Sequence, residues 1–170
     1  MTDDGSPTVY LPEMNEHYHS TKGAVTESRH IYIECALRHR HKTAGDRMIR
    51  LLEVGFGTGL NAALTAADTD FPVHYISLEL YPLDREFAKR LGYDTPLLSQ
   101  VIDAPWDTTA EIRNGFILDK RISDFLNSPL PEDIDVVYFD AFAPEKQPEM
   151  WSEDAIRRVY DCMAVSYTHL

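Results

Sequence analysis

The chain has 170 residues, of which 44% are hydrophobic and 11% aromatic, enough for one domain with a hydrophobic core and too many for a disordered protein. The formal net charge of −12 argues against a general nucleic-acid binder, since neutralising phosphates needs clustered Lys and Arg. No apolar run is long enough to span a membrane, and the acidic N-terminus has no signal-peptide core, so we expect a cytoplasmic protein. The two cysteines and the scattered histidines form no ligand spacing typical of a metal site, so no metal is expected.

The predicted elements alternate between strands and helices. A lead-in over residues 1–47 contains a short strand within 5–13 and a helix over 24–38. Strands are then predicted at 48–54, 73–80, 116–118 and 134–140, helices at 60–67, 83–92, 97–101 and 152–163, and a helical turn at 122–126. This alternation predicts mostly parallel pairing in an open, doubly wound α/β sheet, with ligands outside the C-terminal ends of the strands.

The most informative stretch lies at residues 51–61, where a buried strand leads through Gly55, Gly57 and Gly59 into a helix. Glycines lack the Cβ that would block a close ligand, and the helix presents unpaired backbone N–H groups at its start. The stretch therefore predicts a site for a nucleotide-like ligand.

Two ligands fit this turn. Residues 57–62 match G-x-G-x-x-A, and Glu79 lies 20 residues after Gly59, as in a dinucleotide site, which keeps an NAD-dependent oxidoreductase open. In the alternative pattern, Glu53 ends the strand before the three glycines. An acid there suits the cationic sulfonium and amino groups of S-adenosylmethionine (SAM), although Glu53 can also be an ordinary solvated strand end.

Three longer strings extend the second pattern: EVGFGTGLN at residues 53–61, SLELYPL at 77–83 and YFDAFAPEKQPEMW at 138–151. With the lead-in, they resemble the MnmC-like methyltransferase family, in its stand-alone MnmD form, over roughly residues 5–164. The resemblance implies a class I SAM-dependent methyltransferase with a Rossmann-like sheet. It also implies methylation of the primary amine of 5-aminomethyl-2-thiouridine at the wobble position of bacterial tRNA, with the anticodon loop as partner. The chain lacks the length for the flavin-dependent (FAD) oxidase domain that other members carry.

The resemblance assigns roles on the cofactor side. Glu79 is expected to accept hydrogen bonds from the ribose hydroxyls, and Asp124 to contact the adenine amine, unless Asp124 caps a short helix instead. The turn is expected to line the methionine part by backbone contact, with Glu53 beside it; its residues are Gly55, Phe56, Gly57, Thr58 and Gly59.

On the substrate side, Asp140 is the expected catalytic residue, because a carboxylate can orient the amine or accept its proton. Phe142 and Pro144 are expected to pack against a flipped base, although Phe142 also suits an ordinary core position. Tyr18 and Glu27 are further candidates, as parts of a flap over the cofactor.

The family pattern stops after Ala164. We expect the methyltransferase domain, residues 48–164, to lack its last strands and residues 165–170 to be a non-native tail, which predicts an exposed sheet edge and an unstable or inactive polypeptide. A small-molecule methyltransferase, favoured by the acidic charge, and a non-catalytic fragment remain as alternatives.

Overall fold

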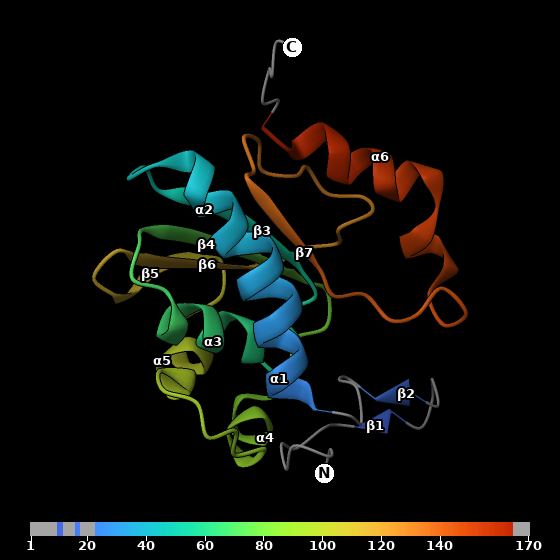
Figure 1. Ribbon diagram of the computed structural model, residues 1–170. Coiled ribbons are helices and arrows are strands. Elements are labelled where there is room, and N and C mark those ends of the chain that lie inside the picture. The colour runs from blue at the N-terminus through green and yellow to red at the C-terminus, as the bar shows by residue number, and fades with distance from the viewer. Residues whose placement is uncertain (1–9, 12–15, 18–22, 165–170) are drawn as a thin grey trace.

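A computed structural model describes residues 10–11, 16–17 and 23–164. Its centre is a five-stranded sheet in the order β5-β6-β4-β3-β7, with helices on both faces, which confirms the predicted mostly parallel α/β architecture (Figure 1). The strands of this sheet are β3 (Ile49–Val54), β4 (Val73–Glu79), β5 (Thr108–Arg113), β6 (Phe116–Ile122) and β7 (Val136–Phe139). A separate antiparallel pair consists of β1 (Tyr10–Leu11) and β2 (Glu16–His17).

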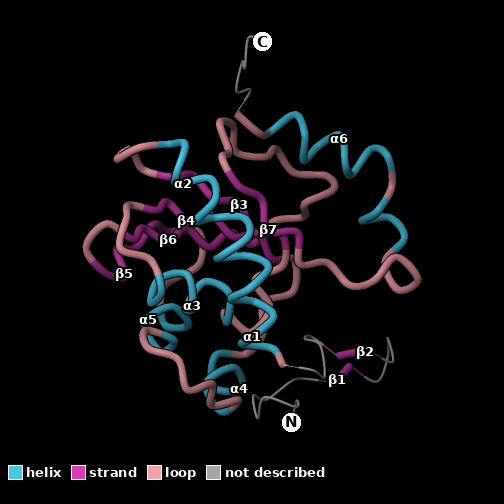
Figure 2. The backbone as a smooth tube through the Cα atoms, in the orientation of Figure 1, coloured by secondary structure: helices cyan, strands magenta, loops and turns pink. Residues whose placement is uncertain are grey.

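The helices follow the predicted order. A continuous helical stretch precedes the sheet and consists of α1 (Ala24–Ser28), the π-helical segment η1 (Arg29–Arg38) and α2 (His39–Ala44) (Figure 2). The others are α3 (Leu60–Asp68), α4 (Arg85–Arg90), α5 (Leu98–Asp103), the 3₁₀ segment η2 (Pro148–Trp151) and α6 (Glu153–Cys162). Ser152 caps α6, because its side chain accepts a hydrogen bond from the Ala155 N–H. None of the described helices is long and apolar enough to cross a membrane.

The strand order places the ligand side of the sheet. From β3 the chain moves outward to β4 and then β6, and it returns to the other side of β3 with β7. All four of these strands run parallel. The direction in which successive strands are added therefore reverses at β3, which has β4 on one side and β7 on the other. Open α/β sheets bind ligands in a crevice at the C-terminal ends of the strands at such a reversal.

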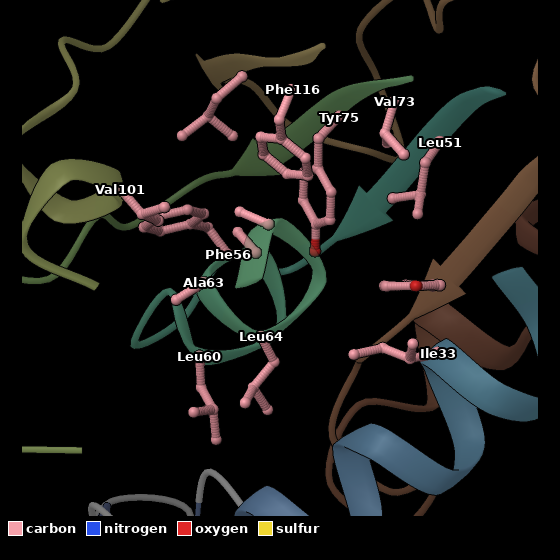
Figure 3. Close-up of a cluster of buried hydrophobic side chains, with 14 of the residues drawn as sticks. Ile33, Leu51, Phe56, Leu60, Ala63, Leu64, Val73, Tyr75, Val101 and Phe116 are labelled. Carbon is pink, nitrogen blue, oxygen red and sulfur yellow. The ribbon is translucent and has the colours of Figure 1, made fainter. Parts of the chain in front are cut away.

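Successive side chains of each strand point to opposite faces of the sheet and form two hydrophobic cores. Ile49 and Leu51 of β3 face a core that also contains Ile33 and Leu64, from the N-terminal helical stretch and α3 (Figure 3). The opposite face of the sheet packs against α6 in a smaller cluster, whose members include Leu52, Val54, Ile76, Leu78, Ala155 and Cys162. Because β3 packs on both faces, the glycine turn that follows it is held between two packed layers.

Two predicted elements differ from the structure, and one strand was not predicted. The N-terminal helix continues to Ala44 instead of ending at 38. Strand β5 was not expected; it pairs antiparallel with β6 across a turn at Gly115, which has a φ of +77°. The helical turn predicted at 122–126 lies two residues later, because β6 continues to Ile122 beside Glu79, and the Ser128 N–H then donates to the Asp124 carbonyl at 2.8 Å.

A buried ion-pair cluster ties the N-terminal helical stretch to the sheet. The Asp135 side chain is only 1% exposed and accepts hydrogen bonds from Arg40 (2.9 Å), Arg47 (2.8 Å) and the backbone N–H of Arg50 (3.0 Å). Burial alone would raise the pKa of Asp135, but the hydrogen bonds from Arg47 and Arg50 and the nearby positive charges hold this pKa below its ordinary value. The ionised carboxylate therefore stabilises the fold at neutral pH.

We expect Asp135→Asn to lower the free energy of unfolding by about 2–3 kcal/mol at pH 7, since it removes a buried charge from two guanidinium groups. Because the pKa of Asp135 is depressed in the folded state, its contribution is present above the unfolded value and is lost as the pH falls through the folded value. Urea unfolding between pH 3 and pH 7 measures this difference, with the exposed Asp133→Asn as control. An equal loss for both variants would contradict the assignment.

Candidate active site

The glycine turn between β3 and α3 has backbone angles that side chains disfavour. Gly55, Gly57 and Gly59 have φ values of +93°, +50° and +78°. A Cβ on Gly55 would lie 3.1 Å from the Asp140 carbonyl oxygen, so the absence of a side chain lets the ends of β3 and β7 approach closely. Gly59 is the N-cap of α3. The turn, in which Gly55 and Gly57 are half-buried and Gly59 is buried, lies at the C-terminal end of β3, where the strand order reverses.

Glu79, at the end of β4, is tied to this turn. Its Oε2 accepts a hydrogen bond from the Gly57 N–H at 3.0 Å, and its Oε1 accepts one from the Tyr81 N–H at 2.9 Å. A carboxylate offers about four acceptor positions, so two remain for other donors. The side chain is half-buried at the rim of the sheet, where ribose hydroxyls were expected.

The two larger side chains of the turn, those of Phe56 and Thr58, are buried. Phe56 is 7% exposed, its ring meets Trp106 edge-on at 5.2 Å, and the Lys120 ammonium lies 4.9 Å from its ring centroid. Thr58 is also buried. Contact of these two residues with the cofactor through their backbone stays a prediction.

Asp140 follows β7, and its carboxylate, like that of Glu79, accepts two hydrogen bonds. Its Oδ1 accepts a hydrogen bond from the Tyr32 hydroxyl and its Oδ2 one from the Asn61 amide, both at 2.9 Å. Burial raises the pKa of Asp140, and the two hydrogen bonds oppose that rise. Such a group is an ordered hydrogen-bond acceptor that becomes a better base as its pKa rises.

The sequence prediction missed both of these partners. Asn61 lies in the first turn of α3, directly after the glycines, where an amide within a ligand motif was a usable signal. Tyr32 lies 108 positions before Asp140 on η1, and nothing in the local sequence marks it. Its ring packs against Tyr138 of β7, with centroids 4.7 Å apart, which fixes the hydroxyl beside Asp140.

Glu53 occupies a different environment from the solvated strand end considered above. Its side chain is fully buried, and its Oε2 accepts a hydrogen bond from the Ser77 hydroxyl at 2.6 Å. Burial, reinforced by the charge of Asp140, raises the pKa of Glu53 to about 8, although hydrogen bonds from Ser77, Tyr75 and Asn61 act against it. In this conformation Glu53 has no surface that a cofactor could reach, so an effect of its charge on the ligand is weak at neutral pH.

Asp124 and Glu27 come from different elements of the chain. Asp124 follows β6, and its carboxylate is held by its own turn, accepting hydrogen bonds from the Leu126 N–H (2.8 Å) and the Asn127 amide (2.6 Å). Glu27 is exposed on α1, and its charge raises the pKa of Asp140. Tyr18 lies outside the described residues.

Phe142 and Pro144 lie in the segment that leaves β7. The backbone of Phe142 is fixed at both groups: its N–H donates to Gln147 Oε1 (3.1 Å), and its carbonyl accepts from Trp151 Nε1 (2.7 Å). Phe142 is half-buried and Pro144 is exposed. The Trp151 ring also meets Phe139 edge-on at 5.3 Å, so this tryptophan anchors the segment against β7.

Comparisons with known proteins agree with this geometry. A family model described as S-adenosyl-L-methionine-dependent methyltransferase matches residues 114–169. The crystal structure of MNMC2 from Aquifex aeolicus superposes with a TM-score of 0.75 at 25% sequence identity, over 96% of this chain and 55% of that one.

Sequence relatives cover nearly the whole chain. Proteins named "tRNA 5-methylaminomethyl-2-thiouridine biosynthesis bifunctional protein MnmC" are 28% identical in Marinomonas sp. (93% of this chain) and 31% identical in Pseudomonas syringae pv. tomato (89% of this chain). The chain spans only 26% of the length of these two relatives.

These comparisons support SAM as the cofactor. They give no support to the alternative that the three glycines bind NAD. From its sheet, its glycine turn and these relationships, the chain is similar to the MnmC-like S-adenosyl-L-methionine-dependent methyltransferases.

Proposed function

We propose that the protein transfers a methyl group from SAM to the primary amine of 5-aminomethyl-2-thiouridine at the wobble position of tRNA. The observation that carries this proposal is the Asp140 carboxylate, held by Tyr32 and Asn61 at the end of β7, directly beside the glycine turn. The names of the MnmC relatives refer to biosynthesis of the 5-methylaminomethyl nucleoside, which differs from the aminomethyl form by one N-methyl group.

The proposed reaction needs no covalent bond between the protein and the methyl group. The amine nitrogen attacks the methyl carbon as the carbon–sulfur bond breaks, and the sulfonium becomes a neutral thioether. The rate depends mainly on holding nitrogen, carbon and sulfur in line. Asp140 accepts an N–H of the neutral amine, stabilises the positive charge that forms on nitrogen, and can take the proton that the product loses.

The other site residues take supporting roles in this proposal. Glu79 accepts hydrogen bonds from the ribose hydroxyls. Asp124, which follows the neighbouring strand β6, contacts the adenine amine. Phe142 and Pro144 provide the wall for the flipped base in the anticodon loop, and Tyr18 and Glu27 belong to the flap over the cofactor. The half-buried Glu79 and the fixed backbone of Phe142 are consistent with these roles.

The second candidate is a methyltransferase for a small amine with the same site. It is favoured by one observation, the formal net charge of −12, which opposes binding to a polyanion. A parallel assay on small primary amines separates the two, because methylation of these amines without methylation of tRNA would overturn the tRNA proposal.

The proposal predicts that Asp140→Asn lowers methyl transfer by about 10²–10⁴-fold and changes SAM affinity by less than about threefold, since Asn keeps the shape and loses the anion. The measurement is transfer of labelled methyl from SAM to tRNA isolated from cells that lack this modification step. The exposed Asp133→Asn serves as control. Undiminished transfer by Asp140→Asn would remove Asp140 from the mechanism.

Tyr32→Phe tests the hydrogen bond from the Tyr32 hydroxyl to Asp140. The Tyr32 hydroxyl stabilises the ionised carboxylate, so its loss raises the pKa of Asp140 further above the ordinary value. The acid limb of the kcat/KM profile, where activity needs ionised Asp140, is then expected to move to higher pH. Tyr81→Phe, at a side chain that is 79% exposed, provides the control. An unshifted limb in Tyr32→Phe would show that this bond does not tune the reaction.

Gly55→Ala tests the close approach at the turn. The added Cβ meets the Asp140 carbonyl oxygen, so we expect SAM affinity to fall by at least about tenfold. Gly45→Ala is the matched control, because Gly45 also has a positive φ of +66° but has no atom within 4 Å of its Cβ position. Calorimetric titration compares the two, and equal losses would mean that backbone strain alone is responsible.

A further inference from the structure

Lys120 of β6 is a buried cation that no acidic side chain pairs. The residue is only 1% exposed, and none of the ion pairs formed by the described residues involves it. Burial lowers the pKa of its ammonium to about 8, so the group is still mainly protonated at pH 7. Taking an ammonium out of water is strongly unfavourable, and an apolar residue of similar size would avoid that cost. The presence of a charge here therefore calls for a physical cause.

One part of the cause is the end of α5. The Lys120 ammonium donates hydrogen bonds to the carbonyl oxygens of Val101 (3.1 Å) and Ile102 (3.0 Å). The last carbonyl groups of a helix receive no hydrogen bond from a following turn. The sequence makes this certain for Val101, because the residue four positions later is Pro105, which has no N–H. The end of α5 consequently holds the ammonium in a fixed place.

The ammonium also lies over two aromatic rings. Its nitrogen is 4.9 Å from the ring centroid of Phe56 and 4.7 Å from that of Trp106. The two rings meet edge-on at 5.2 Å. A cation at this distance is attracted by the negative face of a ring, and the attraction is stronger where water is excluded. Lys120 therefore links the end of α5 to Phe56, which belongs to the glycine turn.

The Phe56 ring packs against the backbone of the same turn. A Cβ added to Gly59 would lie 3.0 Å from Phe56 Cζ, so the ring fills the space beside the N-cap of α3. The Phe56 carbonyl accepts a hydrogen bond from the Gly59 N–H at 2.9 Å, and this bond closes the turn. A displacement of the ring would therefore disturb the backbone between Phe56 and Gly59.

Packing leaves space beside this ring. A partly enclosed cavity of about 40 Å³ adjoins it, and the residues that line the cavity include Phe56, Gly57, Trp106 and Lys120. Such a cavity has room for at least one water molecule, and it offers the ring no atoms to pack against on that side. A directional contact from the ammonium can select one ring position where packing does not.

We propose that Lys120 is a positioning residue whose ammonium, anchored on the end of α5, holds the Phe56 ring and through it the glycine turn in the shape that receives the cofactor. Lys120 does not contact the ligand in this proposal. Its effect on SAM rests on the proposed methyltransferase function, whereas its ordering of the turn does not.

Amide hydrogen exchange tests the ordering of the turn without any ligand. The Gly59 N–H is bonded to the Phe56 carbonyl, and its exchange reports opening of the turn. Lys120→Met keeps an unbranched side chain and removes the charge, and Phe56→Leu removes the ring. In each variant we expect exchange at Gly59 to be at least about tenfold faster, while exchange in β3 stays slow because the sheet remains folded.

Lys89→Met is the matched control. Lys89 is a lysine of α4 that also binds the end of α5, because its ammonium donates to the Asp103 carboxylate at 2.8 Å. Removing this charge changes the net charge of the protein by the same amount as Lys120→Met. We expect exchange at Gly59 in Lys89→Met to equal that of the wild type.

SAM binding tests the consequence for the site. Lys120→Met and Phe56→Leu are each expected to raise the Kd for SAM about tenfold and to leave kcat at saturating SAM within about threefold, since the turn holds the cofactor and takes no part in the transfer. The double variant is expected to lose no more SAM affinity than either single variant, because both changes break the same contact.

The proposal is overturned if exchange at Gly59 in Lys120→Met equals that in Lys89→Met, or if the two single losses of SAM affinity multiply in the double variant. If Lys120→Met does not fold, Phe56→Leu decides, because unchanged exchange in that variant would remove the link between the ammonium and the turn. If the wild type binds no SAM, the proposed function fails, and hydrogen exchange still decides whether Lys120 orders the turn.

Discussion

The Asp140 carboxylate is the point at which three distant parts of the chain meet. The Tyr32 hydroxyl reaches it from the N-terminal helical stretch, the Asn61 amide from α3, and the strand that carries it lies beside β3. A charged group this far from water needs such donors, because burial without them favours the neutral acid. The N-terminal helical stretch is consequently part of the site and not merely a cover over the sheet.

The glycine turn and the carboxylate depend on each other. Because Gly55 has no side chain, the backbone of β3 can pass within contact distance of the Asp140 carbonyl. The Gly57 N–H is held by Glu79, which links the turn to β4. A cofactor in this crevice and an amine at Asp140 would therefore be adjacent, and methyl transfer requires that proximity.

Much of this arrangement was predictable from the sequence. The three glycines, the acid that ends β4 and the acid that follows β7 are local signals, and parallel strands bring their C-terminal ends to one rim. Strand β5 was missed although Asn114-Gly115, a strong hairpin signal, precedes β6. The helical turn assigned to 122–126 begins two residues later because pairing with β4 extends β6 to Ile122, and local propensity does not report pairing.

Tyr32 and Glu53 show what local patterns cannot supply. The role of Tyr32 depends on a contact across 108 positions, and no motif surrounds it. Glu53 was placed correctly at the end of β3, but its burial and its neighbours, not its residue type, determine whether it is charged. Both properties arise only when the sheet and its covering helices are assembled.

The central claim is that this crevice binds SAM beside a carboxylate that receives the amine. Calorimetric titration of the protein with SAM, its demethylated product and NAD tests this most directly. Saturable binding of SAM and of the product at a single site, weakened in Gly55→Ala and without measurable binding of NAD, is the expected result. Binding of NAD without binding of SAM would contradict the claim.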